Sequence, residues 1–359
     1  MYTFNYFTDK YNNLLEKLEK TPQDPIWHSE GNVLIHTEMV LNALNNLIEY
    51  NELTEEEKRI VAYAAFFHDI GKPITTKEEN GRIISPGHSK VGEKDCRIIL
   101  AKENESFHFR ENVCMLIRYH SYPIHYFEKK SYKIVEMSFK LNTKLLYILA
   151  KADLLGRISK DNSLEEYLMN IDYFKEQALF YDCWGKQKEF ENDKARLHFL
   201  KTGELYTPFE EKRSTVYLMC GLPGSGKDSY IKNNLNNIKE ISLDKLREKR
   251  EVRRGNKKDE GQLVQYSKLL AKQYLANNED FVWNATNLSA SFRRDLISIF
   301  LDYTATVKIV YIERKLSEVF KSNDIRGTSF LIDYVKMKFQ TIDIPDLTEC
   351  HEIIYKLEL

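Results

Sequence analysis

The sequence has little of what marks a secreted, membrane-spanning or strongly charged protein. Its 359 residues include five scattered cysteines without Cys-x-x-Cys spacing, so neither a disulfide framework nor a cysteine-based zinc site is expected. The N-terminus lacks a positive start followed by an apolar run, and no segment approaches the roughly 18 apolar residues that span a bilayer. The formal net charge of -1 gives no general affinity for polyanions. These absences predict a cytoplasmic protein, with no membrane partner and with reduced, buried thiols.

What is present predicts a folded chain of more than one domain. Hydrophobic residues make up 42% and charged residues 30%, and 22 Tyr and 19 Phe supply large core side chains. Up to about Asp161 the pattern is helical, with few glycines, an amphipathic stretch over 32–50 and an apolar run over 61–67. We therefore expect an all-α domain over 1–163.

The segment 164–212 is also helical in composition, but it is charged and aromatic. Its aromatic residues recur at roughly helical intervals: Tyr167, Tyr173, Phe174, Phe180, Tyr181 and Trp184. Packing within a connector explains this spacing better than a binding site does.

From Ser214 onward the sequence pattern changes to short apolar strands that alternate with helical segments. Strands are expected over 215–220, 281–283, 307–312 and 353–357. This alternation is typical of a parallel sheet covered by helices. It predicts an α/β domain over 213–359, which makes the whole chain a multidomain protein.

A glycine-rich turn follows the first of these strands and leads into a helix near Lys227. Backbone N–H groups of such a loop surround the phosphates of a nucleotide, and the helix N-terminus adds its positive dipole. Lys227 is placed to reach the β- and γ-phosphates. We expect ATP or another NTP, with Mg²⁺, at Gly221, Leu222, Pro223, Gly224, Ser225, Gly226, Lys227, Asp228 and Ser229.

One position departs from the usual phosphate loop. The residue after the lysine is normally a Ser or Thr that holds magnesium, whereas here it is Asp228, with Ser229 following. An aspartate can hold Mg²⁺ directly or through water. The sequence therefore predicts altered metal handling rather than lost activity.

Further motifs follow the loop: Asp244 and Arg247, Thr286-Asn287-Leu288 with Arg293-Arg294, Asn323-x-x-Arg326-Gly327, and Ile332-Asp333. In this order and spacing the segment 215–340 resembles the phage-type 5′-hydroxyl polynucleotide kinases. That family has an aspartate just before its Thr-Asn pair, whereas this sequence has Ala285, with Asn284 one residue earlier.

The resemblance implies roles for four of these residues. Asp244 resembles the general base that accepts the proton of the attacking 5′-hydroxyl, and Arg247 and Asn287 resemble contacts to the acceptor strand. Charge on the transferred phosphoryl group needs a guanidinium, for which Arg326 is the candidate. Asp244 could instead cap a helix, and Arg326 could be a surface arginine.

A run of basic residues accompanies Asp244 and Arg247. It consists of Lys245, Arg247, Lys249, Arg250, Arg253, Arg254, Lys257 and Lys258. Such runs are often solvated helix faces, but next to Asp244 this one favours a nucleic-acid phosphate backbone over a small neutral acceptor.

Seven of the nine histidines fall before residue 130, in the helical half. The segment 68–73, His-Asp-Ile-Gly-Lys-Pro, places an imidazole and a carboxylate together at the end of an apolar helix, and such groups are costly to bury unless they are paired or bind metal. With His36 and Asp153 this spacing resembles the HD-domain phosphohydrolases over 28–160. Gly87-His88 and Tyr119-His120 resemble the members of that family that hold two metals.

The resemblance implies the metal ligands His36, His68, Asp69, His88, His120 and Asp153. One ion would lie between His36, His68, Asp69 and Asp153, and Asp69 would bridge to a second ion held by His88 and His120. Such a His/Asp set accepts Mn, Fe, Ni, Co or Zn.

Lys72 and four histidines are assigned separately. Lys72 either neutralises the substrate phosphate or is a surface lysine. His108 and His198 are expected to be structural, and His28 and His125 are left open between neighbours of the ligands and surface residues.

The fusion of an HD phosphohydrolase to a polynucleotide kinase is itself a known RNA end-healing family, which the whole sequence resembles. The resemblance implies a kinase for 5′-hydroxyl ends and a phosphoesterase for 2′,3′-cyclic phosphate and 2′-phosphate. It implies RNA as partner, with DNA left open, and a separate RNA ligase in the same pathway.

Two other functions remain open at this point. One is a nucleotide-metabolism enzyme with a nucleoside-type kinase and an HD nucleotide phosphohydrolase, and the basic run at 245–258 argues against it. The other is a regulatory protein with a vestigial HD site, and the intact Lys227, Asp244, His68 and Asp69 argue against that.

Overall fold

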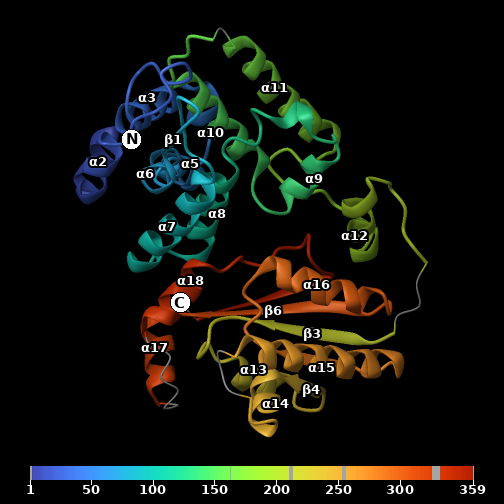
Figure 1. Ribbon diagram of the computed structural model, residues 1–359. Helices are drawn as coiled ribbons and strands as arrows, with labels where there is room; N and C mark the ends of the chain where they lie inside the picture. The colour runs from blue at the N-terminus through green and yellow to red at the C-terminus, as the bar shows by residue number, and fades with distance from the viewer. Residues whose placement is uncertain (1, 162, 210–212, 253–255, 326–331, 359) are drawn as a thin grey trace. The chain divides into compact units, whose positions relative to one another are not determined.

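The computed structural model describes residues 2–161, 163–209, 213–252, 256–325 and 332–358. The chain forms two compact units, Met1–Glu189 and Phe190–Leu359 (Figure 1). The first unit is helical. Its α-helices are α1 (Phe4–Lys10), α2 (Asn12–Glu19), α3 (Val33–Asn46), α4 (Ile48–Asn51), α5 (Glu55–Phe67), α6 (Lys72–Thr75), α7 (His88–Lys102), α8 (Phe107–Tyr119), α9 (Lys133–Ser138), α10 (Thr143–Leu155) and α11 (Leu164–Phe180).

Helix α5 forms the centre of the first unit and packs against α3, α8 and α10. It begins with a capping box in which Thr54 and Glu57 bond each other's backbone N–H groups, which satisfies donors that a helix N-terminus leaves open. All of its residues from Ile60 to Phe67 are buried. Burial on every side of α5 fixes the position of His68 and Asp69, which follow directly.

A small antiparallel hairpin interrupts the expected all-helical pattern. Strands β1 (Lys77–Glu79) and β2 (Arg82–Ile84) pair across Asn80 and Gly81, whose φ values are 53° and 72°. Two positive φ angles in a two-residue loop favour an Asn-Gly hairpin. Its charged, mostly exposed strands carry no apolar alternation, so periodicity did not predict it.

The second unit contains a five-stranded parallel sheet in the order β4-β5-β3-β6-β7. The predicted strands are present as β3 (Thr215–Cys220), β5 (Phe281–Asn284), β6 (Thr306–Arg314) and β7 (Glu352–Glu358). The short edge strand β4 (Lys239–Ser242) was not predicted. The helices are α12 (Asp193–Thr202), α13 (Lys227–Asn234), α14 (Leu243–Lys249), α15 (Lys257–Ala276), α16 (Ala290–Leu301), α17 (Leu316–Ile325) and α18 (Ile332–Gln340).

Helices cover both faces of this sheet (Figure 1). Ile231 of α13 packs with Met219 and Val282 on one face. Side chains alternate along a strand, so Phe281 and Trp283 point to the opposite face, where Phe281 meets Tyr274 of α15 and both rings meet α16. This arrangement buries β3, which leads into the glycine-rich loop.

The segment expected to be a connector is divided between the two units. Helix α11 packs on α10 in the first unit, and α12 belongs to the second, where Arg196 donates hydrogen bonds to the carbonyls of Cys350 and His351. All five cysteines are buried as free thiols, as expected. Across the described ranges, no helix is long and apolar enough to cross a membrane.

Candidate functional site

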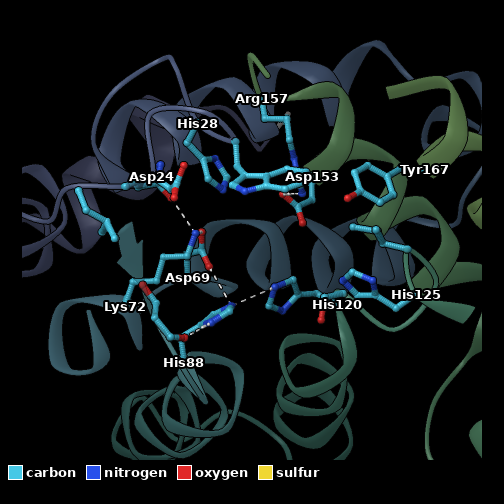
Figure 2. A pocket seen from close by; sticks show the side chains of 16 residues that line it. Asp24, His28, Asp69, Lys72, His88, His120, His125, Asp153, Arg157 and Tyr167 are labelled. Carbon is cyan, nitrogen blue, oxygen red and sulfur yellow. Dashed lines mark hydrogen bonds and ion pairs between the residues drawn. The ribbon is translucent and has the colours of Figure 1, made fainter. Parts of the chain in front are cut away.

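The histidines and aspartates that the sequence singled out meet in one place in the first unit. Asp69, His88, His120 and Asp153 are labelled in Figure 2. His36 comes from α3 and Asp153 from α10, while His68 and Asp69 follow α5. The other two are His88, the first residue of α7, and His120, which follows α8. Tertiary structure therefore joins residues that are up to 117 positions apart in the chain.

Asp69 lies between two sets of nitrogen ligands. Its Oδ2 is 3.2 Å from His68 Nε2 and 3.8 Å from His36 Nε2. His36 Nε2 is also 3.1 Å from Asp153 Oδ1, which closes the first set.

The second set lies on the other oxygen of the same carboxylate. Asp69 Oδ1 is 3.4 Å from His88 Nε2, and His88 Nε2 is 3.4 Å from His120 Nε2. Within each set the ligand atoms lie within 4.8 Å of one another. If each set held an ion, Asp69 would be shared between the two ions.

Backbone carbonyls orient three of the imidazoles in the same way. Nδ1 of His68, His88 and His120 lies 2.7–2.8 Å from the carbonyl oxygen of the residue three positions earlier. A carbonyl only accepts, so each Nδ1 carries a proton and each Nε2 faces the site. This outer hydrogen bond is the usual device that fixes a metal-binding histidine.

Neighbouring charges set the protonation of the site. Burial raises the pKa of Asp69, but the charges of His68 and Lys72 outweigh it and hold the pKa well below its usual range. Burial lowers the pKa of His68, but Asp69 raises it more strongly, so a positive charge is favoured there. Burial and the neighbouring His88 lower the pKa of His120 to about 3. A divalent metal ion would take the place of the extra proton on His68, because such ions bind ionised carboxylates and neutral imidazoles.

Buried polar atoms test whether these residues fit a metal. In the part of the chain that the structure describes, His68 Nε2 and Asp69 Oδ1 are buried without a well-aligned hydrogen bond, whereas Asp69 Oδ2 is ion-paired with Lys72. Leaving such atoms unsatisfied is costly, and coordination would satisfy them. The His/Asp donor set suits the transition metals that the sequence predicted.

The sequence alone did not identify Glu30 as part of this site. Its buried carboxylate lies 2.8 Å from Nδ1 of His28 and 3.0 Å from Nδ1 of His36, and it accepts the N–H of Ile158 at 2.9 Å. Burial raises the pKa of Glu30, but hydrogen bonds from His28 and His36 lower this pKa by more, so the carboxylate is ionised. Glu30 could have been found from its pairing with His28 and His36, but that pairing depends on the path of the chain between His28 and the first turn of α3.

A cavity of about 340 Å³ opens beside the cluster. Lys72 lines it and is buried, with Nζ 2.7 Å from both Asp69 Oδ2 and Gln23 Oε1, so it is not a surface lysine.

Arg157, which the sequence did not single out, also lines the cavity and lies 3.2 Å from Asp153. His28 and His125 line the same cavity, whereas His108 lies exposed on α8.

In the second unit the glycine-rich loop joins β3 to α13, as expected. Gly221 has φ 154°, and an added Cβ would lie 2.6 Å from the carbonyl of Ile312, so no other residue fits. The Lys227 ammonium folds back on the loop and donates to the carbonyls of Gly221 and Leu222 at 3.0 and 2.8 Å. Asn323 of α17 braces the loop through the carbonyl of Pro223 at 3.0 Å.

Asp228 lies in the first turn of α13 and is held by Asn284, the last residue of β5. The Asn284 amide donates to Asp228 Oδ1 and to Glu240 Oε1, each at 2.8 Å. Asn284 thus occupies the end of the strand beside the phosphate loop and keeps two carboxylates together. A role of Asp228 in holding Mg²⁺ stays a prediction.

Asp244 and Arg247 form an ion pair on α14. Ser242, not Asp244, caps this helix, so the alternative of a capping role for Asp244 is wrong. The Asp244 side chain is 70% exposed, and the Arg247 guanidinium also binds Glu260 at 2.9 and 3.0 Å.

Asn287 and Arg326 are the other kinase residues that the sequence predicted. Asn287 is buried with φ 47°, and its amide donates to the carbonyl of Met219 at 2.6 Å, so the structure gives it a bracing role beneath the loop. Arg293 supports it by donating to the Asn287 carbonyl at 2.9 Å. A direct contact of Asn287 with substrate stays a prediction. Arg326 lies outside the described residues.

Comparison with known proteins matches a family model to each unit. A family model described as an HD domain matches residues 33–157, and one described as an AAA domain matches residues 216–333. The N-terminal unit contains an HD domain, and the C-terminal α/β unit is a P-loop kinase-like domain.

Two curated relatives are both named "Multifunctional CCA protein". The one from Mannheimia succiniciproducens is 29% identical over 153 residues, which are 40% of this chain and 35% of the relative. The one from Pasteurella multocida is 28% identical over 153 residues, which are 40% of this chain and 34% of the relative. The chain therefore covers about a third of the length of these relatives.

Proposed function

We propose that this protein repairs both ends of a broken RNA strand. The HD domain removes a 2′,3′-cyclic phosphate or a 2′-phosphate, and the P-loop domain phosphorylates a 5′-hydroxyl. RNA cleavage that leaves a 5′-hydroxyl also leaves such a phosphate, so the two activities act on the same break. A separate RNA ligase would then join the ends.

The position of Asp69 is the observation that carries the first activity. Asp69 lies between two imidazole sets and lines a cavity that Lys72 and Arg157 also line. Two divalent ions held by His36, His68, Asp69, His88, His120 and Asp153 would supply an acidified water and stabilise both oxygens of a phosphoester displacement. Lys72 and Arg157 would orient the substrate phosphate by charge.

The second activity rests on groups gathered at one edge of the sheet. The phosphate loop, Asp228 and Asp244 all follow the carboxyl ends of parallel strands, where ligands of such sheets bind. A 5′-hydroxyl is a weak nucleophile that needs a carboxylate within hydrogen-bond reach, and the exposed Asp244 is the candidate. Arg247 and the basic residues of α14 favour a nucleic-acid acceptor.

Substrate competition tests this proposal. An RNA oligonucleotide with a 5′-hydroxyl and a 2′,3′-cyclic phosphate is incubated with labelled ATP, Mg²⁺ and either Mn²⁺ or Ni²⁺, in the presence of a tenfold excess of nucleosides. We expect label on the RNA 5′ end and loss of the cyclic phosphate. Transfer of label to nucleosides alone would replace the proposal with a nucleotide-metabolism enzyme.

A further inference from the structure

One side of the HD cavity is aromatic and takes no part in the chemistry of the metal ligands. Trp27, His125 and Tyr167 line the same cavity as Asp69, His88 and His120. The rings of Trp27 and Tyr167 have centroids 6.1 Å apart, and those of His125 and Tyr167 are 6.3 Å apart. Figure 2 shows Tyr167 and His125 on one side of the site, with Lys72 on the other.

Two of these three residues come from outside the HD core. Trp27 precedes and Tyr167 follows the residues 33–157 that the HD family model matches. Tyr167 belongs to α11, in the segment whose aromatic residues were expected only to pack. Flanking segments thus add an aromatic wall to a core that already holds the complete ligand set.

Core packing does not explain Tyr167. Farther along α11, Tyr173 and Phe174 pack against Tyr126 with centroids 5.8 and 5.3 Å apart, and Phe174 is fully buried. Tyr167 is only half-buried and faces the cavity instead. The contacts of Tyr173 and Phe174 therefore anchor α11 without Tyr167.

The loops that carry the other two rings are held in place. The backbone around Trp27 is tied to the chain after α10, because Ser29 N–H donates to the Ile158 carbonyl at 2.7 Å and Lys160 N–H to the Ile26 carbonyl at 2.9 Å. The Asn170 amide of α11 donates to the carbonyl of Ile124, next to His125, at 3.0 Å. A wall fixed in this way loses little conformational entropy when a ligand binds.

We propose that Trp27, His125 and Tyr167 form a subsite for the nucleobase of the terminal nucleotide, and this inference rests on the proposed function of the HD site. The phosphate then lies between the His/Asp cluster and the cations Lys72 and Arg157, while the base stacks on the aromatic wall. Every base has an aromatic face, so such a subsite accepts any base and distinguishes nucleotides from other phosphoesters. The cavity, about 340 Å³, is of the size that holds small ligands.

The test compares two substrates that share the reacting group. One is adenosine 2′,3′-cyclic phosphate, and the other is the 2′,3′-cyclic phosphate of 1-O-methyl-ribose, which lacks a base. We expect the ratio of their kcat/KM values to favour the nucleotide in the wild type. Stacking is worth roughly 1–3 kcal/mol per base, so Tyr167→Ala and Trp27→Ala should each lower the ratio by roughly 5- to 150-fold.

Two variants serve as controls. Tyr167→Phe retains an aromatic face and should retain the ratio. Phe180→Ala removes a ring from the same helix, but Phe180 is 77% exposed and lies outside the cavity lining, so the ratio should equal that of the wild type.

Each other outcome overturns a definite part of the argument. Equal wild-type values for the two substrates, or unchanged ratios in both alanine variants, would refute the base subsite and leave the phosphoesterase intact. If the metal-loaded wild type hydrolyses neither substrate, the proposed function fails. Calorimetry with adenosine 2′-phosphate and inorganic phosphate then still decides the subsite, because Tyr167→Ala must weaken only the former.

Discussion

The two candidate sites are built from different parts of the chain. The HD site is made of buried side chains from helices far apart in the sequence, with His36 and His68 at most 1% exposed. The kinase site is made mainly of the backbone of one contiguous loop, and its candidate base Asp244 is largely exposed. The side chains of the HD site are therefore already gathered in one place, whereas the proposed kinase site would be completed by its nucleotide and its acceptor.

The largest expected effect separates the two sites. Asp69→Ala removes the shared ligand, and Lys227→Ala removes the phosphate contact, so each should lower one activity by at least about 10²–10³-fold and spare the other. End-group analysis of an RNA with a 5′-hydroxyl and a 2′,3′-cyclic phosphate measures both at once. Loss of both activities in both variants would refute two independent sites.

Metal affinity tests whether the HD site is preformed. Glu30 orients His36, and loss of such an outer partner typically lowers metal affinity about 10- to 100-fold. Glu30→Gln should show this loss for Mn²⁺ in chelator competition, without any substrate present. Glu38→Gln, which changes an exposed carboxylate on the same helix, is the control. Equal affinities of the two variants would show that Glu30 only stabilises the fold.

A smaller effect is expected for the departure in the phosphate loop. If Asp228 helps to hold Mg²⁺, Asp228→Ala should raise the Mg²⁺ concentration for half-maximal kinase rate by at least about tenfold, since one charge-assisted contact is worth roughly 1.5–3 kcal/mol. The HD activity should not change. Asp295→Ala, an exposed position on α16, is the control, and full activity of Asp228→Ala at limiting Mg²⁺ would refute the assignment.

A separate prediction concerns the pH dependence of stability. Burial lowers the pKa of His28 to about 4, while an unfolded histidine titrates near 6.5. Between these values the unfolded state binds the additional proton, so this group makes the free energy of unfolding fall as the pH decreases from about 6.5 to 4.

Thermal unfolding of the metal-free protein from pH 7 to 4.5 measures this slope. His28→Gln should make it shallower, and His108→Gln, at an exposed position, should leave it unchanged. Equal slopes for His28→Gln and the wild type would show that His28 is not held neutral in the folded protein.

Much of the fold could be predicted because its signals are local. The strand before the glycine-rich loop, the apolar helix before His68 and the alternation of strands with helices were all confirmed. Strand β4 was missed because it is a short, polar sheet edge, and the hairpin β1–β2 was missed although its Asn80-Gly81 turn was a usable signal. Alternation cannot identify strands of only three or four residues.

The sequence by itself determined the chemical types in both sites and the order of the motifs, beginning with the glycine-rich loop, because that loop is contiguous and its backbone is the ligand. Only the tertiary structure decided that Asp69 lies between two imidazole sets, that Lys72 is buried and that Tyr167 faces the cavity. It also placed Glu30 against His28 and His36. These relations depend on how α3, α5, α8, α10 and α11 pack, and packing joins residues whose separation along the chain carries no periodic signal.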